Sequence, residues 1–213
     1  MKHILMAGSL LLLLFACGPS TNITNSWRSG DTTLAHKALR KVMVVGLVAG
    51  KERALKEQME SRLAANLTGE GYTATTATAV FGPKAFENLR ESQVIRKLRS
   101  SGVTGVITIT LLDKDQEENY VPGRVEYYPA MVRYNRFFGY YRTYYNRVYN
   151  PGYYTNTTKY FFETNLYDIT GNKLVYSAQS ETFDPSSAES LAADYAKAIV
   201  RNLKAKQLVN GTK

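Results

Sequence analysis

The sequence predicts an α/β (α+β) fold in which a five-stranded mixed sheet carries three helices. Over residues 41–112, short β-branched runs alternate with segments whose apolar residues recur every three or four positions. After a long interruption, two alternating runs precede one more amphipathic segment. The expected order is strand, helix, strand, helix, strand, insertion, strand, strand, helix. Right-handed crossovers make the first three strands parallel, and the last two strands form an antiparallel hairpin.

The first strand and helix have clear patterns. The run KVMVVGLV, Lys41 to Val48, is apolar throughout, which is typical of a central strand covered on both faces. The following helix presents an apolar residue every four positions, and Gly69 and Gly71 end it. The residues of this stripe are Leu55, Met59, Leu63 and Leu67.

The next three elements complete the parallel part of the sheet. Tyr72 to Val80 is rich in Thr and Ala and predicts a strand near an edge, ended by Gly82-Pro83. A second helix is expected to end at Gly102. Its apolar residues are Phe86, Leu89, Ile95 and Leu98. The run VTGVITITLL, residues 103–112, predicts a third strand that is apolar on both faces.

The hairpin and the last helix follow the interruption. Residues 160–167 and 173–182 are alternating runs joined by Asp168-Ile-Thr-Gly-Asn172, which indicates a β-hairpin. Pro185 in a first turn and a Ser186-x-x-Glu189 capping box predict the start of the last helix. Its apolar stripe consists of Leu191, Tyr195, Ile199 and Leu203.

The amino-terminal residues 1–16 have the pattern of a lipoprotein signal peptide. Lys2 and His3 precede the apolar run Ile4 to Phe15, and Leu14-Phe-Ala-Cys17 resembles the bacterial lipobox. Cys17, the single cysteine of the chain, is the expected lipidation site. The alternatives are an ordinary signal peptide with an incidental cysteine, or a short membrane anchor. A spanning helix needs about 20 residues, which exceeds this run.

The sequence also predicts the cellular location of the protein and the limits of its domain. Gly18 to Ser26 contains no charged residue, and by resemblance to known bacterial lipoproteins this implies the periplasmic face of the outer membrane. Residues 17–40 are assigned to a tether and entry segment, 41–208 to a single domain, and 209–213 to a tail. The formal net charge of +9 suits anionic envelope material, and secretion argues against nucleic acid.

The insertion, residues 120–157, is rich in tyrosine and arginine. Residues 120–154 hold 11 of the 16 tyrosines, together with five arginines and no lysine. This composition is typical of contact surfaces. A partner-binding or sugar-stacking loop, a self-packing spacer and a membrane-inserting hairpin remain open. The residues expected to contact a partner are Arg133, Arg136, Tyr140, Tyr141, Arg142, Tyr144, Tyr145 and Arg147.

The residues that enzymes need are sparse. Beyond the signal segment the chain has one histidine, His36, and no cysteine other than Cys17, so we expect no catalytic site, metal or cofactor. Gly46 to Lys51 is similar to a phosphate loop but lacks its Ser/Thr, and a strand-to-helix loop explains it better. The acidic residues after the third strand indicate a solvated strand end rather than a calcium loop. They are Asp113, Asp115, Glu117 and Glu118.

These features together resemble a family of uncharacterised Bacteroidota lipoproteins, with the most specific likeness in ETNLYDITGNKLVYSAQSETFDPSS, Glu163 to Ser187. The element order is also similar to the periplasmic domains of the curli-secretion channel lipoprotein and to the amino-terminal domain of the Tol translocation protein. These resemblances imply a membrane-tethered envelope protein that binds an envelope protein, a glycan or an anionic lipid headgroup. The alternatives are a subunit of an oligomeric secretion pore and a hydrolase with an unrecognised acidic pair.

Overall fold

The computed structural model describes residues 21–48, 52–87, 89–121 and 153–209. By its internal contacts the chain divides into two units. Residues 1–114 together with 159–213 form the first, and residues 115–158 form the second. The packing described below is that of the first unit.

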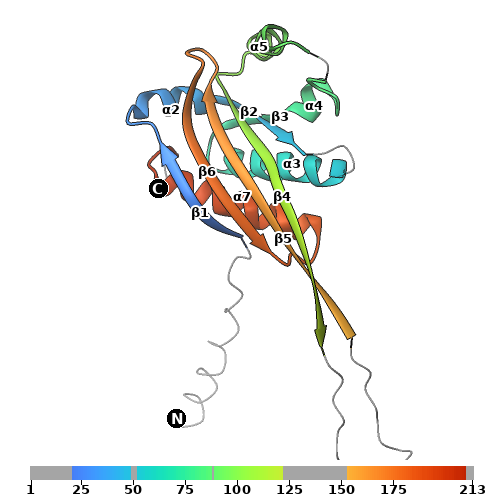
Figure 1. Ribbon diagram of the computed structural model, residues 1–213. Helices are drawn as coiled ribbons and strands as arrows, with labels where there is room; N and C mark the ends of the chain where they lie inside the picture. Colours follow the sequence, from blue (N-terminus) through green and yellow to red (C-terminus); the bar gives the residue numbers. More distant parts are fainter. Residues whose placement is uncertain (1–20, 49–51, 88, 122–152, 210–213) are drawn as a thin grey trace, which may run out of the picture. The chain divides into compact units, whose positions relative to one another are not determined.

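The first unit is built on a mixed sheet of six strands in the order β1-β6-β5-β4-β2-β3 (Figure 1). The strands are β1 (Thr21–Arg28), β2 (Lys41–Leu47), β3 (Thr73–Thr76), β4 (Gly105–Val121), β5 (Tyr153–Asp168) and β6 (Lys173–Phe183). β2 pairs in parallel with both β3 and β4, and β6 pairs antiparallel with β5 and β1. The predicted α/β class and its mixed sheet are confirmed, with six strands instead of five.

The sixth strand is β1, which comes from the segment that the sequence assigned to the tether. Its sequence TNITNSWR has little apolar periodicity, because β1 is an edge strand with a β-bulge between Ile23 and Asn25. The same segment also contains helix α2 (Thr32–Leu39), whose N-cap Asp31 accepts a hydrogen bond from the Thr33 amide at 3.0 Å. The sheet therefore begins only four residues after Cys17.

One face of the sheet is covered by α2, α3 (Arg53–Gly69) and α7 (Ala188–Ala205), which lie behind it in Figure 1. The predicted stripes of α3 and α7 point into this main core and are fully buried. Val44 and Ile107 meet them from β2 and β4. Gly105 allows the close approach of α2, because a Cβ there would lie 2.4 Å from the Ala38 carbonyl oxygen.

The other face is covered only in part. The short helix α4 (Ala77–Phe81), the turn at 83–87 and α5 (Glu91–Ser100) enclose a smaller core with Met43, Val45 and Val106 of the sheet. In Figure 1 these elements lie beside β2 and β3, and no described helix crosses the front of β4, β5 and β6. We call this uncovered area, together with the adjoining part of β1, the open face.

Several element limits differ from the sequence expectation. The predicted strand over 72–80 is shorter, because the Thr76 hydroxyl accepts from the Ala79 amide at 3.0 Å and starts α4. The second helix begins at Glu91, so Phe86 lies in the preceding turn. The last helix is capped by Ser187 and Ser190 instead of the expected Ser186 and Glu189.

The predicted hairpin is present, with its turn held by a buried side chain. The Asp168 carboxylate accepts hydrogen bonds from the amides of Thr170 at 3.2 Å and Gly171 at 2.6 Å. Tyr176 and Ala178 face the main core together with Phe162 and Leu166. Among the described residues, no helix has the length and apolarity that crossing a membrane requires.

Candidate functional site

The open face carries large apolar side chains that remain accessible to solvent. Along each strand, every second residue points away from the main core. On β6 and β1 these positions include Phe183, 55% exposed, and Trp27, 51% exposed. On β4 and β2 they include Leu112, 52% exposed, and Leu47, 53% exposed. The sequence predicted that the strands of Leu47 and Leu112 were covered on both faces. The exposure of these two side chains corrects that prediction.

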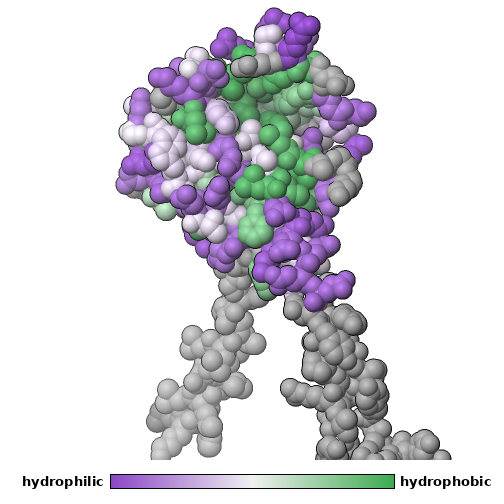
Figure 2. Space-filling model, viewed as in Figure 1, coloured by the Kyte–Doolittle hydropathy of each residue, from purple (hydrophilic) through white to green (hydrophobic). Residues whose placement is uncertain are grey.

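Leu47, Leu112 and Phe161 form an apolar patch, which we call the sheet patch. Leu47 pairs with Thr110, two residues before Leu112 on the same side of β4. β4 and β5 run in opposite directions in Figure 1, and the Thr108 hydroxyl reaches the Asn165 carbonyl at 3.5 Å. This register places Phe161 beside Leu112. Figure 2 shows a continuous hydrophobic area on this side of the molecule.

A hollow of about 410 Å³ adjoins the sheet patch. Val45 and Leu47 line one side of it, and Pro83, Ala85 and Phe86 line the other. The Lys56 ammonium crosses its rim and donates to the Pro83 carbonyl at 3.1 Å. The hollow therefore extends the apolar surface beyond the end of β2, where open α/β sheets commonly bind ligands.

Glu60 of α3 fixes the strand and helix that border the hollow. Its buried carboxylate accepts hydrogen bonds from the amides of Gly46 at 2.8 Å and Thr78 at 3.1 Å. A Cβ at position 46 would lie 2.7 Å from Lys56 Cγ, so glycine allows α3 to pack closely on β2. Close packing thus explains Gly46, which lies within β2, whereas residues 49–51 of the phosphate-loop-like stretch lie outside the described residues.

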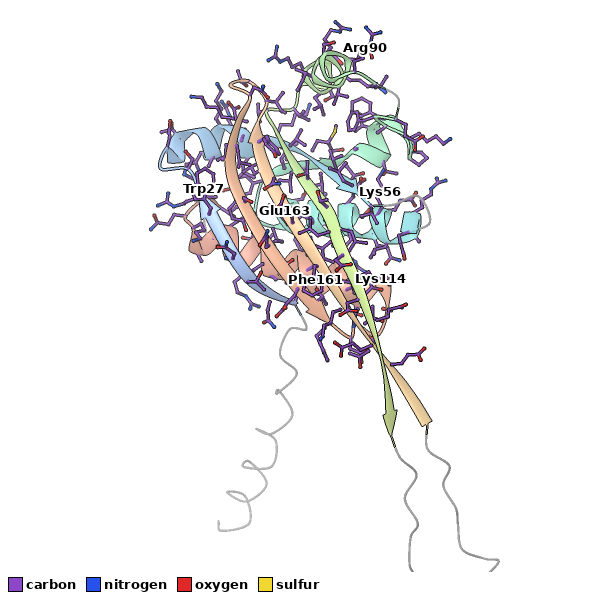
Figure 3. The ribbon with its side chains drawn as sticks, in the orientation of Figure 1. Trp27, Lys56, Arg90, Lys114, Phe161 and Glu163 are labelled. Carbon is purple, nitrogen blue, oxygen red and sulfur yellow. The ribbon has the colours of Figure 1, made fainter. Side chains whose placement is uncertain are left out.

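Lys114 occupies the last position of the first unit on β4. Its ammonium donates to Glu52 Oε1 at 3.1 Å and lies 5.2 Å from the centre of the Tyr160 ring. Figure 3 labels the Lys114 side chain, close to the label of Phe161. The hydrogen bond to Glu52 raises the pKa of Lys114. The pair joins β4 to the start of α3, and both side chains are partly accessible. The Lys114 ammonium and the Glu52 carboxylate therefore neutralise each other, as expected of a structural ion pair at the border of the open face.

Two tyrosines of the main core hold buried hydroxyl groups. The Tyr195 hydroxyl shares a hydrogen bond with the Thr164 hydroxyl, and the Tyr176 hydroxyl donates to Asn202 Oδ1 at 2.8 Å. Burial raises the pKa of both phenols above their ordinary value. Each hydroxyl has its partner inside the core, so these groups stabilise the fold of the domain.

Most residues that the sequence singled out for function lie outside the described residues. These are Cys17, Arg133, Arg136, Tyr140, Tyr141, Arg142, Tyr144, Tyr145 and Arg147. His36 lies on α2, and Asp113 is exposed on β4. Within the described part of the chain, no three His, Cys, Asp or Glu side chains converge in a way that could hold a metal ion.

No protein-family model and no curated protein matches the sequence. Among solved structures, the PelC dodecamer from Paraburkholderia phytofirmans is similar at 12% identity, with a TM-score of 0.44 over 84% of this chain and 94% of that chain. Lipoprotein GNA1162 from Neisseria meningitidis is similar at 15% identity, with a TM-score of 0.43 over 78% of this chain and 98% of that chain. The chain thus has a distant structural likeness to these two proteins.

Proposed function

We propose that the protein is a non-enzymatic lipoprotein, anchored through Cys17 at the periplasmic face of the outer membrane, which binds another envelope protein. The observation that carries the binding role is the sheet patch of Leu47, Leu112 and Phe161, which adjoins a hollow lined by apolar side chains together with Lys56, Lys84 and Glu87. Contiguous exposed apolar surface is unfavourable in water, and its free energy falls when a partner covers it. The lipobox-like tetrapeptide supports the anchor.

The chemistry of the patch favours a protein partner over a glycan. The centres of protein interfaces are apolar and contain few charged residues. The sheet patch, formed by Leu47, Leu112 and Phe161, has the same character. A sugar site needs polar groups that point to the ligand. On the open face, the side-chain amide of Asn165 donates to Glu163 Oε1 at 2.8 Å instead of pointing to a ligand. In our proposal the Tyr/Arg-rich segment contributes further contacts to the same partner, and its arginines match acidic groups on it.

Photo-crosslinking tests the binding role. A benzophenone amino acid replaces Phe161 in the full chain, and cells are irradiated. We expect an adduct with a distinct envelope protein that Leu112→Asp abolishes. The matched control is Val80→Asp, because Val80 is 45% exposed on α4, away from the sheet patch. An adduct that Leu112→Asp leaves unchanged would contradict the binding role of the patch, and an adduct between two copies of this chain would favour the pore subunit instead.

The anchor needs its own test. Cys17→Ser should abolish labelling with radioactive palmitate and release the protein from the membrane fraction, because the thiol is the acylated group. Several acyl chains hold a protein stably, whereas one chain is marginal. A Cys17→Ser variant that still floats with membranes in high salt would show that something other than acylation holds the protein there.

A further inference from the structure

The two long helices on the covered side of the sheet leave a groove between them. The carboxyl-terminal halves of α3 and α7 border a hollow of about 450 Å³. All of its lining residues belong to the first unit, and both helices lie behind the sheet in Figure 1. We call this hollow the helix groove. It lies on the side of the sheet opposite to the sheet patch.

Small residues keep the helix groove open on the side of α3. Ala65 and Gly69 line it one helical turn apart, and both are exposed. A Cβ at Gly69 would meet no atom within 4 Å, so the space beside this glycine is open. The side-chain amide of Asn66 also lines the groove and forms no hydrogen bond with a described residue. This wall therefore offers space for a chain and an amide that can both donate to it and accept from it.

The wall formed by α7 is cationic. Lys197, Arg201 and Lys204 line it, at intervals of four and three residues. The Lys204 ammonium pairs with Glu70 Oε2 at 2.7 Å. Lys197 and Arg201 are exposed, and neither has an ion-pair partner among the described residues. Both cations can therefore bind negative groups of a ligand without breaking an existing pair.

We infer that the helix groove binds an acidic segment of another protein in the extended conformation. Helix residues four apart, such as Lys197 and Arg201, are separated by about 6 Å along the axis. In an extended chain every second side chain points the same way, at a spacing of about 6.6 Å. Alternate carboxylates of a peptide thus match the two cations, whereas a phosphate group presents one centre of charge. The inference is independent of the anchor and of the sheet patch.

Fluorescence anisotropy of the full-length protein, purified in detergent, tests the inference. The probe is a short fluorescein-labelled peptide in which Asp alternates with Ala, and the neutral control peptide has Asn in place of Asp. We expect saturable binding of the acidic peptide alone, weakened by added salt. Lys197→Ala and Arg201→Ala should each weaken binding about two- to fivefold, the range of exposed ion pairs. The matched control is Arg96→Ala, which removes the same charge from an exposed position of α5 and should leave binding unchanged.

Gly69→Leu separates the helix groove from the general positive charge of the protein. The leucine side chain fills the open space and alters no charge, and the backbone of Gly69 does not lie in the left-handed region. This variant should lose most of the peptide binding and keep the circular dichroism and melting temperature of the parent.

Several results would overturn the inference. One is peptide binding that Gly69→Leu leaves unchanged, and another is equal weakening by Arg96→Ala and Arg201→Ala. Equal binding of the neutral peptide, or no saturable binding of the acidic one, would also contradict it. Displacement of the peptide by inorganic phosphate at constant ionic strength would assign the groove to a phosphate-bearing ligand instead.

Discussion

Glu60 is a carboxylate that lies entirely within the protein, between α3, β2 and α4. It accepts hydrogen bonds from two backbone amides, that of Gly46 at 2.8 Å and that of Thr78 at 3.1 Å. Removing such an acceptor leaves both donors buried without a partner, which is more costly than the hydrogen bonds are worth. At the scale of one residue, Glu60 thus sets the position of the hollow relative to the sheet.

Glu60→Ala should lower the free energy of unfolding by about 1–3 kcal/mol, because the two amides lose their acceptor. Urea denaturation followed by circular dichroism measures this change. Glu57→Ala is the matched control on the same helix, since the Glu57 side chain is 41% exposed and forms an ion pair with Arg53 one helical turn away. Equal stability of the two variants would show that Glu60 is not a structural anchor.

The buried phenols of Tyr176 and Tyr195 predict a loss of stability at high pH. In an unfolded chain the pKa of tyrosine is about 10, and burial raises both pKa values in the folded protein. Only the unfolded chain then releases these protons readily above about pH 10. Their stabilising contribution is therefore complete below that pH and decreases as the pH rises through it.

Denaturation at pH 8 and at pH 11 measures the effect. Tyr195→Phe should reduce the difference between the two pH values, although the lost hydrogen bond to Thr164 costs about 1 kcal/mol at both. Tyr167→Phe, on the open face, is the control for removing a tyrosine hydroxyl. An unchanged pH dependence in Tyr195→Phe would contradict the assignment of the alkaline transition to this residue.

At the scale of elements, β4 presents one side to the main core and, around Leu112, the other side to solvent. Ile107 is 1% exposed and Leu112 is 52% exposed on the same strand. Ile107→Asp should unfold the domain, because an unpaired buried carboxylate costs several kcal/mol against a typical total stability of about 5–15 kcal/mol. Leu112→Asp should melt close to the parent while losing the proposed partner. Thermal melts of both variants separate these outcomes, and a cooperative melt of Ile107→Asp would place Ile107 outside the core.

Much of the element pattern could be predicted from the sequence because burial leaves a periodic trace. The α3 stripe, the hairpin and the strands around Val44 and Ile107 are where the pattern placed them. β1 was missed for a physical reason. An edge strand with a bulge buries few side chains, so Ile23 is its one aliphatic residue. The exposure of Leu47 and Leu112 was also missed, since an apolar run has the same composition whether or not a helix covers it.

At the scale of the whole molecule, the chain divides into two units, and all the described core residues belong to the first. Replacing residues 122–152 with a short Gly/Ser linker should therefore leave the melting temperature close to that of the parent. The strands on either side of the replacement, β4 and β5, are neighbours in the sheet, so a short linker can join them. Collapse of the cooperative melt would show that this segment is part of the core.

The same variant tests the proposed contact role of the segment. Replacement should weaken the partner adduct, and Arg133, Arg136, Arg142 and Arg147 changed together to Ala should weaken it in a salt-dependent way. Retention of the full adduct would limit binding to the sheet patch. For the candidate site, the sequence predicts this segment and Cys17, and both stay predictions because they lie outside the described residues. The sheet patch depends on which faces the helices cover, which is a property of the tertiary structure.

The pairing of Thr21 with Thr182 also has a kinetic consequence. The two residues are 161 positions apart, so β1 has no partner until β6 exists. Closing a loop of that length costs roughly 4–5 kcal/mol of chain entropy, and contacts of this range slow folding. The first strand to leave the ribosome is thus among the last to be paired. Folding of the sheet is completed only after the chain has been synthesised and has emerged as far as Phe183, the last residue of β6.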